Sequence, residues 1–174
     1  MIPSLLFQRH GIGVDLVSVK RCQALCQRQG PAAWARLGVL TPPDDPESER
    51  LFAKRWACCE AIWKATRQCG WHLNLTEIDI QHDEAGRPWW RLRPCEGTLP
   101  RTELWLREEY VSVEAHFSSE TLGGSVARLI PATEPERVVV MRSSLSLSDE
   151  EDVVIAICSC VIELDEQTAQ VELR

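Results

Sequence analysis

An acid and a base lie one helical turn apart in the stretch RLFAKRWACCEAIWKAT, residues 50–66. Glu60 and Lys64 are four positions apart, so both side chains would project from the same side of a helix. A second isolated acid, Asp15, follows the glycines of the run GIGVD, and glycines let a ligand approach the backbone closely. Two carboxylates from separate elements can hold a hard cation such as Mg²⁺, and a neighbouring lysine suits a phosphate bridged by that cation. Together the three residues predict phosphoryl-type transfer.

The same spacing is also common on ordinary helix surfaces. An exposed Glu–Lys pair at this spacing stabilises a helix by only ~0.3–0.5 kcal/mol. Two features favour a functional site over a surface pair. The pair borders an aromatic stripe, so Glu60 is expected to be only partly solvated, and Asp15 supplies a second carboxylate.

The element that must position this pair is a predicted helix over residues 48–68, where alanines and long side chains predominate. At about 100° per residue, Phe52, Trp56 and Trp63 fall on one stripe, with Cys59 close to it. We therefore expect the tryptophans to anchor the helix in the core.

The remaining elements place helices early and strands late. Residues 11–19 alternate as a strand, and the following residues form a helix that ends near Gly30, with a short helix after Pro31. Later strands are predicted in the ranges 75–93 (a hairpin with its tip at 84–87), 110–130 (a hairpin with its turn near Glu120), 138–148, 152–164 and 169–173. This order predicts an α+β fold, an antiparallel sheet packed with a long helix, in one domain over residues 1–174.

Composition narrows the functional class. The chain has 174 residues, 44% of them apolar and 26% charged, as in soluble globular proteins. No apolar run approaches the ~20 residues of a membrane helix, and the N-terminus lacks the pattern of a secretory signal. A net charge of −7 argues against general nucleic-acid binding. We expect a cytoplasmic protein that binds neither nucleic acid nor membrane.

The eight cysteines contain no CxxC pair, so the usual structural-zinc spacing is absent. Without an export signal they are interpreted as reduced thiols that serve as small apolar residues. A cysteine-based metal or redox protein remains an alternative. It requires the thiols of Cys58 and Cys59, or those of Cys158 and Cys160, to lie close together in the fold.

Charge is distributed unevenly along the chain. Between Arg9 and Leu37 five residues are basic and one is acidic. This basic segment could receive an acidic partner or phosphates, or it could be a solvated helix face; charge alone does not decide.

The order of these motifs resembles a known family. GIGVDLVSV, then RLFAKRWACCEAIWKA about forty residues later, then the hairpin sequence beginning GRP, are similar to the holo-acyl-carrier-protein synthases, a group of 4′-phosphopantetheinyl transferases. SLSLSDEEDVVIAICSCVIE (144–163) resembles the family's closing strands. The resemblance covers most of 11–94 and 143–164, and residues 95–140 are expected to contain a hairpin-like insertion of uncertain structure.

The resemblance implies an activity and a metal site. Family members transfer 4′-phosphopantetheine from coenzyme A to a serine of an apo acyl carrier protein, with Mg²⁺. By position, Asp15 and Glu60 match the metal ligands, so Glu60 and Lys64 are the implied catalytic residues.

The resemblance also implies binding residues. Lys64 and Arg55 match residues that contact coenzyme A, and Gly70 is the one glycine left of the family's phosphate-binding turn. Arg21 matches a basic residue that holds the carrier protein. The family assembles as a trimer with sites at subunit contacts, so a homotrimer is expected.

The chain departs from the family pattern at several positions. Cys59 replaces the lysine before the helix glutamate, Ser18 replaces an acidic residue, and Ser144 stands where a histidine leads the closing strand. These departures favour an alternative, a non-catalytic relative that binds a carrier protein. The presence of Asp15, Glu60 and Lys64 favours an enzyme.

Overall fold

The computed structural model describes residues 8–93, 101–106, 109–119, 124–131 and 138–165. Its helices are α1 (Val19–Gln29), α2 (Pro31–Ala35) and α3 (Ser48–Gln68), with a short 3₁₀ turn, η1 (Leu75–Glu77). Its strands are β1 (Gln8–Ser18), β2 (Trp71–His72), β3 (Ile78–His82), β4 (Pro88–Leu92), β5 (Arg101–Leu106), β6 (Glu109–Ser119), β7 (Gly124–Pro131), β8 (Val138–Glu150) and β9 (Val153–Asp165).

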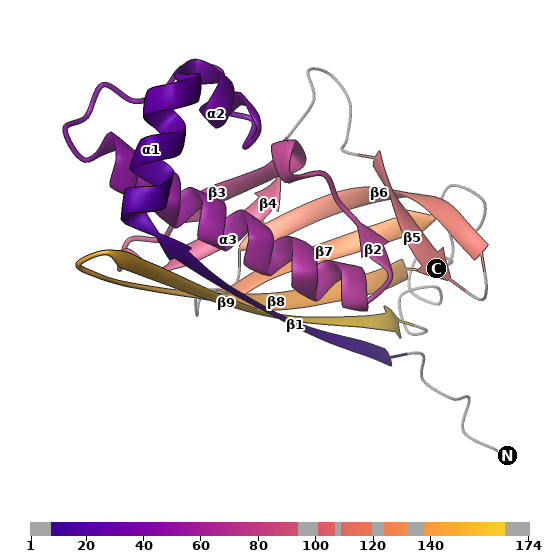
Figure 1. Cartoon of the computed structure of the whole chain (residues 1–174). Coiled ribbons are helices and arrows are strands. Elements are labelled where there is room, and N and C mark those ends of the chain that lie inside the picture. Colours follow the sequence, from indigo (N-terminus) through magenta and orange to yellow (C-terminus); the bar gives the residue numbers. More distant parts are fainter. Residues whose placement is uncertain (1–7, 94–100, 107–108, 120–123, 132–137, 166–174) are drawn as a thin grey trace, which may run out of the picture.

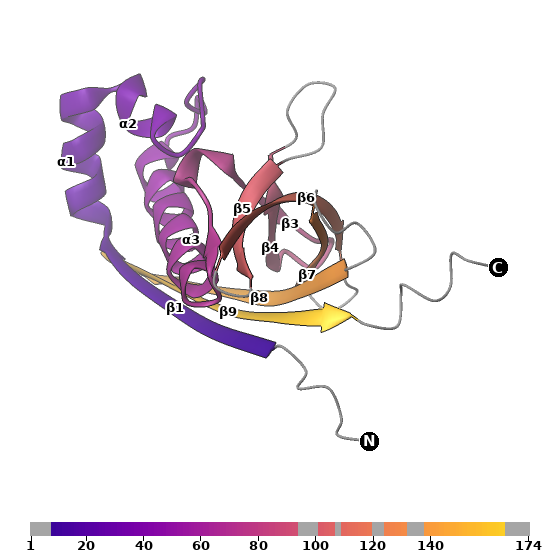
Figure 2. The same ribbon diagram turned by 90° about the vertical axis from the view of Figure 1, so that its right-hand side faces the viewer.

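Within these residues the strands form one large antiparallel sheet of seven strands, in the order β1-β9-β8-β7-β6-β5-β2, and a separate hairpin, β3-β4. The long helix α3 lies across one face of this sheet, and α1 and α2 gather at one end (Figure 1). Figure 2 shows the sheet curling from β1 towards β5, so that α3 and the β3-β4 hairpin lie on its concave side. The α+β prediction is confirmed.

Most predicted elements are present, and two strands were not predicted. The three helices and the strands β1, β3, β4, β6, β7, β8 and β9 occur where the sequence pattern places them. The two strands that were not predicted are β2 and β5, at the end of the large sheet. Strand β2 pairs with β5, and β5 pairs with β6. The strand predicted at 169–173 falls outside the described residues.

The predicted insertion continues the large sheet. Strand β7 pairs with β8, and its Ala127 and Leu129 are fully buried in the same core as α3. Trp90 of the β3-β4 hairpin packs 5.7 Å from Trp71, centroid to centroid, and donates its indole N–H to Ser143 at 2.8 Å. The hairpin therefore fills the space between the helix and the curled part of the sheet.

The buried face of α3 consists mainly of small side chains. Phe52 and Cys59 are buried as expected, together with a row of alanines (Ala53, Ala57, Ala61 and Ala65). The expectation that the tryptophans anchor the helix holds only in part. Trp56 packs against the edge of the core, while Trp63 is partly exposed and lies under the Arg67 guanidinium, 5.0 Å from the ring centroid.

The alanines allow β1 to lie unusually close to α3. A Cβ atom added to Gly11 would be 1.9 Å from the carbonyl oxygen of Ala65, and one added to Gly13 would be 1.8 Å from that of Ala61. No real Cβ contact is so short, so any side chain at either glycine would push the strand away from the helix. This contact sets the distance between Asp15 on the strand and the polar residues of the helix.

The variant Gly13→Ala is expected to destabilise the fold by about 3 kcal/mol or more, the upper end for overpacking, because the added methyl group would meet the backbone of Ala61 and no flexible side chain. Gly86→Ala is the matched control, since Gly86 has a φ of +75° but nothing within 4 Å, and a left-handed residue costs only about 1–2 kcal/mol. The free energy of unfolding in urea measures both. Equal losses in the two variants would contradict the account of the close approach.

Candidate functional site

Asp15 and Lys64 meet at the contact between β1 and α3. The Lys64 Nζ lies 2.7 Å from Asp15 Oδ1 and also donates to the carbonyl of Val14 at 3.2 Å. The Asp15 side chain is only 15% exposed, so solvent screens this ion pair less than a surface pair. The structure thus brings the strand carboxylate Asp15 and the helix lysine Lys64 together.

Glu60 is the second carboxylate at this place. It makes no hydrogen bond or ion pair with any of the described residues. Partial burial, and then the negative charge of Asp15, raise the pKa of Glu60, while Lys64 acts in the opposite direction. A carboxylate without a partner beside another carboxylate is a place where a cation would be stabilised.

Gln68 holds the free edge of β1 in position. Its side-chain amide donates to the carbonyl of Ile12 at 2.8 Å, and its side-chain oxygen accepts from the Ile12 N–H at 3.2 Å. Lys64, one turn earlier, donates to the carbonyl of Val14. The edge of β1 is therefore covered by α3 next to Asp15, which keeps the carboxylate in register with the helix.

A basic cavity adjoins Asp15 on the side of α1. It has a volume of about 270 Å³ and is lined by Asp15, Trp56 and three arginines (Arg21, Arg28 and Arg36). Ser18 caps α1 by accepting the backbone N–H of Arg21 at 3.3 Å. The serine that departs from the family pattern thus fixes the start of the helix that carries Arg21.

A second, larger cavity lies against α3. Its volume is about 630 Å³, and its lining includes Lys54, Arg55, His82 and Asp149 as well as apolar residues. The Arg55 guanidinium donates to the carbonyls of Leu37 and Ile78, at 3.3 and 3.1 Å. Arg55 therefore ties the segment after α2 and strand β3 to the long helix while it borders the cavity.

The structure does not bring all predicted site residues together. Arg55 and Lys64 are nine positions apart, which places them on opposite sides of a helix and about 13.5 Å apart along its axis. Gly70 lies beyond the end of α3, with a φ of +81°, and its N–H donates to the carbonyl of Arg67. Asp15, Glu60 and Lys64 form one group, and Arg55 belongs to the other cavity.

Sequence reasoning missed Asp149. Its carboxylate lies 2.7 Å from Arg50 Nη1 and 3.2 Å from Lys54 Nζ, so it joins the end of β8 to the first half of α3. The hydrogen bond from Arg50 is the main reason that the pKa of Asp149 is lowered. The available signal was an acid after a predicted strand and two bases four residues apart on a predicted helix, but nothing local links the two segments.

The cysteines behave as core residues. Those of the described part are all free, and burial raises the pKa of Cys58, Cys59 and Cys158 to about 12 each. Among the described residues no group of three or more His, Cys, Asp or Glu side chains could hold a metal ion. Cys59 is fully buried, so it presents no group to the Glu60 site. No described helix is long and apolar enough to cross a membrane.

Comparison with known proteins agrees with this architecture. No protein-family model matches the chain. The holo-[acyl-carrier-protein] synthase of Neisseria meningitidis serogroup A is 30% identical over 154 residues, which cover 84% of this chain and 94% of that protein. The protein of the same name from Nitrosospira multiformis is 34% identical over 101 residues, covering 54% of this chain and 79% of that protein.

The fold has a counterpart among solved structures. An apo-ACPS structure from Chronobacterium ammoiniagenes aligns with a TM-score of 0.51 at 16% identity, covering 89% of this chain and 98% of that chain. Fold and sequence together define an enzyme of the 4′-phosphopantetheinyl transferase class. The chain belongs to the holo-[acyl-carrier-protein] synthase family.

The buried cysteines lead to a prediction about reactivity. Because the thiolate is the reactive form, Cys58, Cys59 and Cys158 should resist iodoacetamide at pH 8 while the chain is folded and react once guanidinium unfolds it. Peptide mapping by mass spectrometry measures the modified fraction at each position. Alkylation of Cys59 in the folded chain would show that this thiol is open to the site and could take part in chemistry.

Proposed function

We propose that this chain transfers the 4′-phosphopantetheine group of coenzyme A to a serine hydroxyl of an apo acyl carrier protein, and that the reaction requires Mg²⁺. The observation that carries the proposal is the group formed by Asp15, Glu60 and Lys64, in which two carboxylates and one ammonium meet at the contact between β1 and α3. The names of the relatives support the same reaction.

The residues present fit a magnesium ion. Mg²⁺ binds to one or two carboxylates and keeps several waters, so Asp15 and Glu60 are a sufficient protein contribution. Partial burial, and then the charge of Asp15, raise the pKa of Glu60, and a bound cation would offset both by stabilising the charged carboxylates. When bound, the ion would polarise the pyrophosphate of coenzyme A.

The chain's own residues supply charge and proton transfer. In the reaction the serine oxygen forms a bond to phosphorus, the bond from that phosphorus to the 3′,5′-ADP oxygen breaks, and the serine proton is lost. Glu60 is suited to accept that proton, because its carboxylate makes no hydrogen bond or ion pair within the described residues. Lys64 is placed to offset the negative charge that develops on the departing 3′,5′-ADP.

The binding partners can be assigned to the two cavities. An acidic carrier protein matches the basic cavity beside Asp15, where Arg21 lies on the side from which the serine must arrive. Coenzyme A matches the larger cavity, since Arg55 and Lys54 border it and its lining is largely apolar. The free thiols of the described part fit a cytoplasmic location.

A second copy of the chain would complete the site. Arg55 and Lys64 lie on opposite sides of α3, so one coenzyme A molecule would contact both most directly if they came from neighbouring subunits. The outer face of β1 and β9 supports such an assembly, because it carries a row of exposed aliphatic side chains (Ile12, Val14, Leu16, Ile155 and Ile157). We propose a homotrimer formed through this face.

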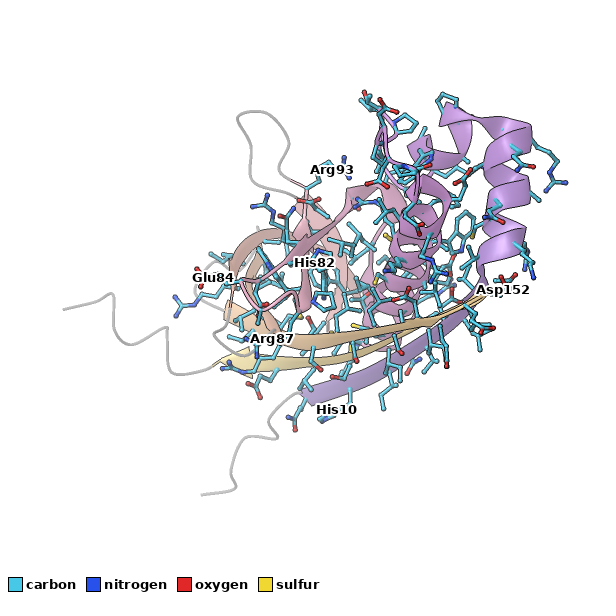
Figure 3. The ribbon with its side chains drawn as sticks, turned by 90° about the vertical axis from the view of Figure 1, so that its left-hand side faces the viewer. His10, His82, Glu84, Arg87, Arg93 and Asp152 are labelled. Atoms are coloured by element: carbon cyan, nitrogen blue, oxygen red, sulfur yellow. The ribbon has the colours of Figure 1, made fainter. Side chains whose placement is uncertain are left out.

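Replacement of Glu60 by Gln should abolish transfer, measured as release of 3′,5′-ADP, because the amide neither binds Mg²⁺ as a carboxylate does nor accepts the serine proton. The thermal midpoint should not fall, since Glu60 makes no hydrogen bond or ion pair within the described residues. Glu84→Gln is the control, at the far end of the β3-β4 hairpin from α1 (Figure 3). Normal turnover by Glu60→Gln would contradict the role of Glu60 in the transfer reaction.

Replacement of Leu16 by Glu should convert the assembly to monomers, because Leu16 is 64% exposed beside Ile155 in the aliphatic row and burial of a charge there is costly. Sedimentation equilibrium measures the mass, and transfer should be lost along with the assembly. Ala85→Glu, on the exposed hairpin tip, should leave the mass unchanged. An unmodified chain that sediments as a monomer would contradict the trimer.

A further inference from the structure

Three charged residues form a fixed cluster at the wall of the larger cavity. Asp149 accepts hydrogen bonds from Arg50 on one oxygen and from Lys54 on the other, at 2.7 and 3.2 Å. Arg50 also donates to the carbonyl of Glu151 and lies 3.5 Å from Glu47, so its donors are directed at the protein. Within the described residues Lys54 makes no other hydrogen bond or ion pair, and it borders the cavity together with Asp149.

The roles of the two bases in this cluster therefore differ. Arg50 anchors the carboxylate to the start of α3, and the carboxylate in turn restrains Lys54. An ammonium group has three N–H donors, so Lys54 can keep its bond to Asp149 and still donate to a ligand in the cavity. Glu47 and Asp149 offset Arg50 and Lys54 in total charge, so the attraction for an anion comes from the free donors of Lys54 together with Arg55, which also borders the cavity.

We propose that Asp149 is a positioning residue for coenzyme A, which holds the Lys54 ammonium at the cavity wall where a phosphate group of the nucleotide end binds. The inference rests on the proposed function for the identity of the ligand. Neither the sequence pattern nor the names of the relatives gives Asp149 this role. The carboxylate repels a phosphate little, since both of its oxygens already face cations.

The expected effect is on binding. Without Asp149, Lys54 is free to rotate and must be ordered when the ligand binds, which should weaken coenzyme A binding about three- to tenfold. Asp149→Asn keeps an oxygen that can accept from Lys54, and Asp149→Glu keeps the charge, so both should bind more tightly than Asp149→Ala. If the carboxylate acted mainly by repulsion, all neutral variants would bind coenzyme A more tightly.

The test is calorimetric titration of coenzyme A with Mg²⁺, without carrier protein, into the full chain and its variants. In a double-mutant cycle, Asp149→Ala should weaken binding in the native background and have no further effect in the Lys54→Met background. Asp152→Asn is the matched control. Asp152 lies on the same β8-β9 hairpin as Asp149, but it pairs with Lys20 of α1 and is outside the cavity lining (Figure 3). Thermal midpoints show which variants are folded. If Asp149→Ala does not fold, Asp149→Asn takes its place in the cycle.

Two results would overturn the inference and leave the proposed function standing. One is that Asp149→Ala and Asp149→Asn bind coenzyme A as tightly as the native chain or more tightly. The other is that the losses from Asp149→Ala and Lys54→Met add, which would mean that Asp149 does not act through Lys54. Failure of the native chain to bind coenzyme A at all would overturn the proposed function, and the inference with it.

Discussion

Strand β1 lies against α3 only because Gly11 and Gly13 have no side chains, and the polar site depends on that contact. The carbonyls of Ala61 and Ala65 occupy the space where Cβ atoms would be. Close contact between the two backbones leaves no room for water, and Gln68 and Lys64 satisfy the strand edge from the helix. A strand displaced outward by one methyl group would carry Asp15 away from the helix. The glycines of the GIGVD motif thus serve packing in this chain.

The long helix separates two kinds of chemistry. One side faces β1 and gathers the two carboxylates and Lys64, while the other side borders the large, mainly apolar cavity with Arg55 and Lys54. A helix turns through about 100° per residue, so these residues cannot converge within one chain. A site divided between the two sides of one helix is explained if each active site is formed by two neighbouring subunits. The exposed aliphatic face of β1 and β9 is the surface through which such subunits would associate.

Local patterns predicted most of the fold. Helix α3 and the β3-β4, β6-β7 and β8-β9 hairpins depend on contacts within short segments, and their periodicity is readable in the sequence. Strand β2 has only two residues, so no alternation can signal it, and its partner β5 is about thirty residues away. Trp63 was assigned to the core because it shares a helical stripe with Phe52 and Trp56, but close packing on β1 requires alanines on the buried face, which turns Trp63 outward.

The candidate site was predictable in part for the same reason. Asp15, Glu60 and Lys64 follow from spacing and from the glycines before the strand acid, and the structure places them together. Asp149 was not predictable, since it meets Arg50 and Lys54 from a strand about a hundred residues away. Likewise, the buried state of Cys59 depends on how α3 packs on the sheet, so the sequence alone left open whether this thiol faces the site.

The most direct test of the account is the intact mass of an apo acyl carrier protein after incubation with this chain, coenzyme A and Mg²⁺, with and without EDTA. The account predicts that the carrier gains the mass of one phosphopantetheine group, and that EDTA prevents the gain until excess Mg²⁺ restores it. No gain across several carrier proteins, with the chain folded, would contradict the assignment of an active transferase. A gain that persists in EDTA would contradict the metal role of Asp15 and Glu60.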